Sequence, residues 1–147
     1  MTTARTLTVP APASSVAVAY FGAQLGFEVD PDDLARDLDA GRADGYVVVE
    51  TRAPAAFAQA RIPGAINLPY PDLTSETTAH LDRDLVYVCY CESSDCNAAT
   101  KGALKLAELG FRVKRLSGGI TSWMAAGYPV EGHPVQARAE AGIRCAC

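Results

Sequence analysis

The stretch that decides the fold is LVYVCYCESSDCNAATKGALKLAEL, Leu85 to Leu109. It begins as a run of apolar and β-branched residues, passes through a short polar loop after Cys91, and continues as an amphipathic helical pattern. This order predicts that Cys91 lies where a parallel strand ends and a helix is about to begin. Backbone N–H groups and the positive end of the helix dipole would then converge on its sulfur and favour the reactive thiolate.

The segments on either side repeat this alternation of strand and helix. The predicted strands lie at residues 27–30, 46–50, 65–68, 85–90 and 111–116. The predicted helices lie at residues 14–25, with Gly26 as the expected stop, and at 31–40, 54–60, 97–109 and around Trp123. On the helix at 97–109, the face expected against the sheet carries Ala103, Leu104, Leu106 and Ala107. Strands separated by helices throughout the chain indicate a layered α/β fold.

The length of 147 residues suits one domain. We expect a loose leader at residues 1–13, a single domain at 14–135 and a flexible tail at 136–147. With 13 Lys and Arg against 17 Asp and Glu, the chain lacks the basic balance of a nucleic-acid-binding protein. The apolar run Val16–Phe21 is too short to cross a membrane and lacks the features of a signal peptide. We therefore expect a cytoplasmic protein without nucleic-acid or membrane partners.

Five cysteines leave several chemistries open. They are Cys89, Cys91, Cys96, Cys145 and Cys147. An odd count without a secretion signal argues against a framework of structural disulfides. Their spacings lack the paired C-x-x-C motifs of structural zinc sites, and His80 and His133 complete no ligand pattern, so no metal site is expected.

Three motifs occur in order between Phe27 and Gly132. They are VVVETRAPAAFAQARIPGAINLPY at residues 47–70, VYVCYCESSDCNAA at 86–99 and GGITSWMAAGYPV at 118–130. Together they resemble the motifs of the rhodanese family of sulfurtransferases. The resemblance implies a three-layer α/β fold with a central, mostly parallel five-stranded sheet flanked by helices.

The resemblance also implies that Cys91 is the catalytic residue and begins a six-residue loop. That loop consists of Cys91, Glu92, Ser93, Ser94, Asp95 and Cys96. In the chemistry of the family, the thiolate takes sulfur from a small-molecule or protein-borne donor, thiosulfate or a persulfide, and passes it to cyanide or a thiol. The N–H groups from Ser93 to Asn97 would stabilise the thiolate and the persulfide anion, and no cofactor is required.

Cys91 is preferred over its two neighbours because of its position. Cys89 lies inside the predicted strand, where we expect a buried core thiol. Cys96 lies at the start of the helix, as a capping thiol or as a resolving partner that forms a disulfide with Cys91. Cys145 and Cys147 are candidate relay thiols, although cysteines in a flexible tail are also common incidental residues.

The sequence departs from the family pattern at four charged positions. Glu50 stands in the place of an Asp, and Arg61 in the place of a His, which puts a permanent cation near the mouth of the site. Arg52 matches the motif and is expected to fix the loop by pairing with Glu50 or with the loop itself. Glu92 and Asp95 add two negative charges beside the nucleophile, so thiosulfate is expected to be a poor donor unless both carboxylates point into solvent.

Three other functions use the same kind of fold. Cysteine phosphatases and arsenate reductases have a longer loop with an arginine, but no Arg or Lys follows Cys91 before Lys101, which argues against oxyanion chemistry. A non-catalytic binding module stays open as an alternative, because the fold does not guarantee activity. A thiol redox protein that uses Cys91 and Cys96 is the other alternative.

Overall fold

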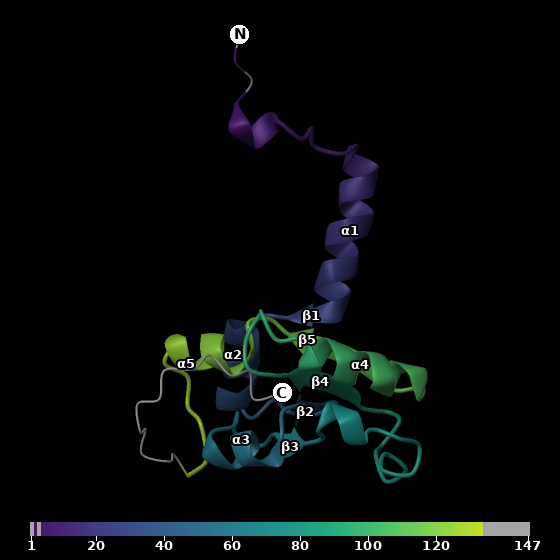
Figure 1. The fold of residues 1–147 in the computed structure, drawn as a ribbon, viewed down its shortest axis with the longest axis vertical. Coiled ribbons are helices and arrows are strands. Elements are labelled where there is room, and N and C mark those ends of the chain that lie inside the picture. Colours follow the sequence, from purple (N-terminus) through teal and green to yellow (C-terminus); the bar gives the residue numbers. More distant parts are fainter. Residues whose placement is uncertain (1, 3, 134–147) are drawn as a thin grey trace.

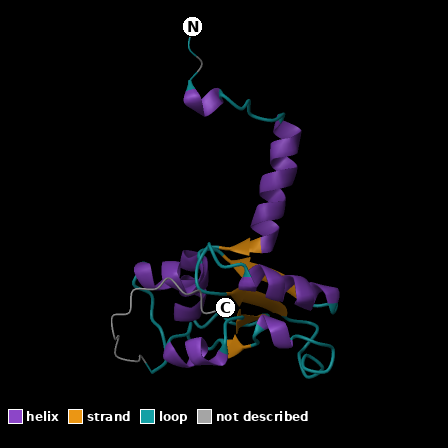
Figure 2. Ribbon diagram, in the orientation of Figure 1, coloured by secondary structure: helices purple, strands orange, loops and turns teal. Residues whose placement is uncertain are grey.

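The computed structural model describes residue 2 and residues 4–133 of the chain, and its central element is a five-stranded sheet. Its strands are β1 (Glu28–Val29), β2 (Tyr46–Glu50), β3 (Ile66–Asn67), β4 (Val86–Tyr90) and β5 (Arg112–Leu116). They lie in the order β1-β5-β4-β2-β3, and every neighbouring pair is parallel. Each strand lies within a segment predicted from the sequence. The predicted α/β fold with a parallel five-stranded sheet is confirmed (Figure 2).

Helices cover the two faces of this sheet and give the fold its three layers (Figure 1). The helices are α1 (Ser14–Phe27), α2 (Pro31–Asp39), α3 (Pro54–Gln59), α4 (Ala98–Glu108) and α5 (Gly119–Ala125), with short 3-10 turns η1 (Arg5–Leu7) and η2 (Tyr70–Asp72). Alternate residues of a strand point to opposite faces. Accordingly Tyr87 and Cys89 pack with Leu106 of α4, whereas Val88 and Tyr90 pack with Leu34 of α2 and with α5.

The face of α4 against the sheet differs from the prediction. Its buried residues are Ala98, Ala99, Gly102 and Leu106, whereas Leu104 is 58% exposed. The cause is Gly102, because a Cβ at this position would come within 2.6 Å of the Thr51 Cγ2 atom. The close approach of helix and strand at this glycine sets the rotation of α4 about its axis, and that rotation turns Leu104 outward.

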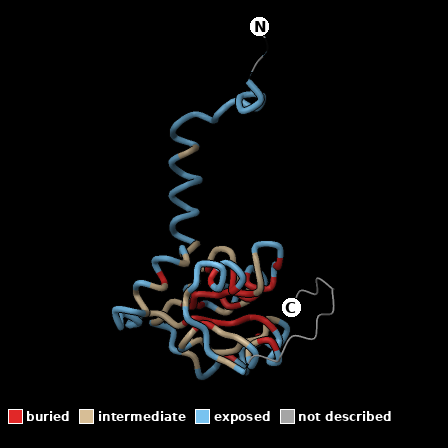
Figure 3. The backbone as a smooth tube through the Cα atoms, turned by 90° about the vertical axis from the view of Figure 1, so that its left-hand side faces the viewer, coloured by how far each residue is buried: buried red, intermediate tan, exposed pale blue. Residues whose placement is uncertain are grey.

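Helix α1 stands away from the layered part of the molecule (Figures 1 and 3). The predicted helix is present, but Gly26 does not stop it, because α1 continues through Gly26 to Phe27 before β1 begins. None of its residues is buried. Among the described residues, no helix is long and apolar enough to cross a membrane. The predicted tail at residues 136–147, which includes Cys145 and Cys147, lies outside the described part of the chain.

Candidate active site

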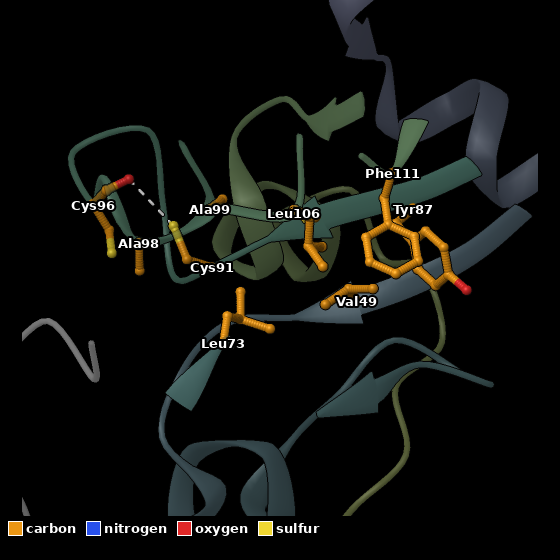
Figure 4. Packing of buried hydrophobic residues seen from close by; sticks show 10 residues of the cluster. Val49, Leu73, Tyr87, Cys91, Cys96, Ala98, Ala99, Leu106 and Phe111 are labelled. Atoms are coloured by element: carbon orange, nitrogen blue, oxygen red, sulfur yellow. Dashed lines mark hydrogen bonds between the residues drawn. The ribbon is translucent and has the colours of Figure 1, made fainter. Parts of the chain in front are cut away.

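Cys91 directly follows the last residue of β4, at the carboxyl edge of the parallel sheet. Its side chain is a free thiol, 2% exposed, and packs near Ala98 and Ala99 at the start of α4 (Figure 4). The Sγ atom donates to the carbonyl oxygen of Cys96 at 3.2 Å and lies 3.7 Å from that of Ser93. Since carbonyl oxygens only accept hydrogen bonds, the Cys91 thiol is the donor in this contact.

Two N–H groups of the loop are used within the loop itself. The N–H of Cys96 donates to the carbonyl oxygen of Ser93 at 3.2 Å, and that of Asp95 donates to the Ser93 Oγ at 3.3 Å. These bonds close the turn that brings the end of the loop back to its beginning. None of these bonds is directed at the Cys91 sulfur. Stabilisation of a Cys91 thiolate by the N–H groups from Ser93 to Asn97 therefore stays a prediction.

A small pocket opens beside the Cys91 sulfur, with a volume of about 220 Å³. Its lining comes from the loop, the end of β5, the turn into α5 and the base of β1, with residues Glu28, Cys91, Ser93, Ser94, Cys96, Ala99, Arg115, Leu116, Ser117, Gly118 and Gly119. A water molecule occupies about 30 Å³ of liquid, so this volume suits a ligand of a few atoms. The pocket lies where parallel sheets usually place their sites, at the carboxyl ends of the strands.

Backbone hydrogen bonds from α5 hold the first two loop residues. The N–H of Ile120 donates to the carbonyl oxygen of Cys91 at 3.0 Å, and that of Thr121 donates to the carbonyl oxygen of Glu92 at 2.9 Å. Gly119 has a φ of +61°, and a Cβ there would lie 2.5 Å from the Cys91 carbonyl oxygen. Any side chain at Gly119 would therefore displace the loop that carries the thiol.

A buried ion cluster, which we call the Arg52 cluster, lies behind the loop and consists of Glu50, Arg52 and Glu92. The Arg52 side chain is 6% exposed and pairs with Glu50, which is completely buried. Its Nη1 atom donates to the Glu92 carboxylate at 2.6 Å, and its Nη2 atom donates to the Ala60 carbonyl oxygen at 2.8 Å. Burial alone would lower the pKa of Arg52, but hydrogen bonds and charges from both carboxylates outweigh it and raise the pKa.

The Arg52 cluster changes the expected electrostatics of the loop. Glu92, predicted to act as a negative charge beside the nucleophile, is hydrogen-bonded to Arg52, which is also paired with Glu50, so the three residues together carry one net negative charge. Asp95 is exposed to solvent, where screening is strong. The two carboxylates are thus not equivalent, and Arg52 contacts both partners that the sequence left open, Glu50 and the loop.

Arg61 lies apart from the Cys91 pocket and is not among its lining residues. Its backbone pairs with Glu131, its Nε atom lies 3.9 Å from the Glu131 carboxylate, and its guanidinium lies over the Phe57 ring at 4.8 Å. The cation expected near the mouth of the site thus packs instead on α3 and the segment after α5.

A different arginine lines the pocket, and the sequence reasoning missed it. Arg115, near the end of β5, pairs with Glu28 and donates to the Thr100 Oγ1 at 2.7 Å. Ser117 also donates to the Glu28 carboxylate, at 3.2 Å. The hydrogen bond from Arg115 is the main reason why the pKa of Glu28 is lowered. We call Glu28 and Arg115 the Arg115 pair. The two residues are brought together by the register of β1 against β5, in which they are direct partners.

The other two described cysteines, Cys89 and Cys96, differ in their surroundings. Cys89 is completely buried in the core, and burial, with the nearby Cys91, raises its pKa to about 12, as expected of an inert core thiol. Cys96 is nearly buried at the end of the loop, and no disulfide joins it to Cys91, which is a free thiol. The resolving role of Cys96 stays a prediction.

Comparisons with known proteins agree with this architecture. The sequence model of a family described as Rhodanese-like domain matches residues 30–126. The chain is 31% identical over 104 residues to a sulfurtransferase of Allochromatium vinosum, covering 70% of this chain and 92% of that protein. It is 36% identical over 112 residues to the HTH-type transcriptional regulator Rv0324 of Mycobacterium tuberculosis, covering 76% of this chain but only 49% of the regulator. The crystal structure of the BH2092 protein from Bacillus halodurans superimposes with a TM-score of 0.77 at 39% identity, covering 81% of this chain and 86% of that one.

Proposed function

The chain belongs to the rhodanese-like domain family, and from this premise we propose that it is a sulfurtransferase that carries sulfur as a persulfide on Cys91. The observation that carries the proposal is the position of Cys91. It is a free thiol at the head of a closed loop, beside a pocket of about 220 Å³ at the carboxyl edge of the sheet. A pocket of this size admits a donor of a few heavy atoms or the sulfur end of a larger one.

The first half-reaction begins when the Cys91 thiol leaves its carbonyl acceptors and gives its proton to solvent. The thiolate then attacks the outer sulfur of the donor and forms a new S–S bond. The old bond to that sulfur breaks, and its electron pair leaves with the donor remnant, which is sulfite for thiosulfate or a thiolate for a persulfide. The product is a persulfide anion on Cys91.

The second half-reaction returns Cys91 to its starting state. A thiolate or cyanide attacks the terminal sulfur, the bond between the two sulfurs of the persulfide breaks, and its electron pair stays on Cys91. No net oxidation occurs and no further reactant is needed. The protein contributes a fixed position for the sulfur, because Ile120 and Thr121 hold the loop through its backbone and Arg52 holds it through Glu92.

The Arg115 pair gives the pocket a feature that bears on the choice of donor. The Arg115 guanidinium faces the pocket from a partly exposed position, 42% exposed, in contrast to the buried Arg52. An anionic end of a donor can hydrogen-bond to this guanidinium, which is also paired with Glu28. Thiosulfate therefore belongs among the donors to be tested, together with low-molecular-mass and protein-borne persulfides.

The test is direct detection of the persulfide. The reduced chain is incubated separately with thiosulfate and with a low-molecular-mass persulfide, and the peptide containing Cys91 is analysed by mass spectrometry. We expect the added mass of one sulfur atom, released as thiocyanate by cyanide, in the wild type and in the control Cys89→Ala but not in Cys91→Ser. Absence of the persulfide from the wild type with every donor would favour a binding module. A readily reducible disulfide between Cys91 and Cys96, without sulfur transfer, would favour a redox protein.

A further inference from the structure

Helix α1 leaves an unusual amount of apolar surface in water. Its large apolar side chains are 57% to 78% exposed: Val16, Val18, Tyr20, Phe21, Leu25 and Phe27. No residue of α1 is charged, and no residue is buried (Figure 3). A helix that is apolar all round is normally covered by other protein or by lipid.

The apolar residues of α1 form two seams along opposite sides of the helix. Val16, Tyr20, Ala23 and Phe27 follow one another at intervals of four, three and four residues and make the first seam. The second seam has the same kind of spacing and consists of Val18, Phe21 and Leu25. These intervals are those of the core positions of packed helices. A partner that covered one side only would leave the other seam in water.

Gly22 and Gly26 lie between the seams, on a third side of α1. Each glycine inside a helix costs about 1 kcal/mol relative to alanine, and neither has the positive φ that would demand a glycine. A Cβ at either position would meet nothing within 4 Å in this chain. Close approach of another helix backbone is the use that glycines at a spacing of four residues have in helix pairs.

The layered part of the molecule continues this surface next to the base of α1. A mainly apolar hollow of about 450 Å³ lies between α4 and β5, lined by Phe27, Ala103, Leu104, Ala107 and Val113 together with Glu28, Thr100, Lys114 and Arg115. It includes Leu104, the residue that the rotation of α4 turns outward. Phe27 belongs both to the first seam and to this hollow, so the two form one continuous surface.

We propose that α1 is a dimerisation element that packs against α1 and the α4–β5 hollow of a second copy of this chain. The three aromatic side chains alone leave roughly 380 Å² exposed at ~200 Å² each, and Val16, Val18 and Leu25 add to this toward the ~800 Å² per partner of a stable interface. Because α1 carries no charged residue, two copies of it meet without repulsion, as a two-fold interface requires. A helix of the second copy on the glycine side lies between the two seams and contacts both, and the hollow of that copy adds to the covered area.

A membrane fits α1 less well than a second copy. A helix that lies in a membrane interface has one apolar face and one polar face rich in Lys and Arg. Helix α1 has apolar seams on opposite sides and carries no Lys or Arg. Its 14 residues are also fewer than the ~20 that a spanning helix needs.

The test is sedimentation equilibrium of the whole chain under reducing conditions, which excludes dimers joined by disulfides. We expect a dimer for the wild type. Gly22→Leu/Gly26→Leu should raise the dissociation constant at least tenfold although it favours the helix itself, because the added side chains keep the two backbones apart. Ala17→Leu is the matched control: it adds the same side chain on the side of α1 opposite the glycines and should leave the dimer unchanged.

A second variant tests the role of the seams. Phe21→Glu places a charge in the second seam and should also give a monomer, while circular dichroism and thermal unfolding of the domain stay as in the wild type because α1 contributes nothing buried. A monomeric wild type at concentrations of about 100 μM would overturn the proposal. So would an equal loss of dimer in Ala17→Leu, or association of the wild type only with phospholipid vesicles. Glu28 and Arg115 line both the hollow and the Cys91 pocket, so persulfide formation is measured separately for each variant to distinguish loss of the dimer from loss of the proposed function.

Discussion

Two arginines flank the Cys91 loop, each bound to a glutamate, and they differ in burial. The Arg52 cluster lies behind the loop, with Arg52 6% and Glu50 0% exposed, whereas in the Arg115 pair at the pocket Arg115 is 42% and Glu28 23% exposed. A buried arginine whose acceptors are all in place has a structural role, because the loss of any partner would leave an unpaired charge buried away from water. A partly exposed arginine keeps donors for a ligand. We therefore propose that Arg52 positions the loop and that Arg115 contributes to the binding of substrate.

The largest effect, on the free energy of unfolding, is expected when Arg52 is substituted. Arg52→Ala leaves Glu50 buried without its cation and should lower the free energy of unfolding by about 3–5 kcal/mol. Urea unfolding measures this change, and Arg52→Lys, which keeps the charge, should recover part of it. A loss below about 1 kcal/mol, the range of surface pairs, would show that the Arg52 cluster does not hold the structure.

The next effect concerns the backbone contact on the same side of the loop. Gly119→Ala places a Cβ against the Cys91 carbonyl oxygen and should reduce formation of the persulfide at least tenfold. The matched control is Gly127→Ala, which has the same kind of positive φ, +79°, but no atom within 4 Å of the added Cβ. The control should show only the loss of stability due to backbone strain, about 1–3 kcal/mol. Equal effects on persulfide formation would mean that strain, not displacement of the loop, is responsible.

A smaller effect, on the Michaelis constant, is expected at Arg115. Arg115→Gln should raise the Michaelis constant for thiosulfate roughly three- to tenfold, the worth of one charged hydrogen bond at a partly exposed site. The maximal rate and the stability should change little, because the Arg115 pair is open to solvent. Arg36→Gln serves as the control, since Arg36 is also paired with a carboxylate but is absent from the pocket lining. A marked loss of stability with little change in the Michaelis constant would give Arg115 the structural role proposed for Arg52.

The smallest effect separates the two loop carboxylates. Because the Glu92 carboxylate is held by Arg52 and lines no part of the Cys91 pocket, and Asp95 is exposed, Glu92→Gln and Asp95→Asn should each change the Michaelis constant for thiosulfate less than about twofold. Steady-state rates over a range of ionic strength measure this. A marked fall in the Michaelis constant for either variant would restore the original expectation that the acidic loop repels an anionic donor.

Local sequence identified most of the architecture and the position of Cys91 at the end of β4. The strand segments, the helix after Cys91 and the core role of Cys89 all depend on patterns within ten to fifteen residues, which a chain carries whatever it packs against. The wrong prediction for Leu104 has its cause in a contact between residues distant in the sequence. Leu104 fits an apolar helix face, but the close approach of Gly102 to Thr51, 51 positions away, rotates α4 and leaves Leu104 exposed.

The sequence by itself determined that a cysteine, Cys91, follows a buried strand of an α/β sheet, since hydrophobic periodicity and turn residues act locally. Only the tertiary structure decided which charges meet there. Glu28 faces Arg115 because β1 pairs with β5, and Glu92 meets Arg52 because the loop after β4 folds over the end of β2. Ion pairs between distant segments depend on strand order and register. Those are set by the packing of the whole sheet, and no local pattern reveals them.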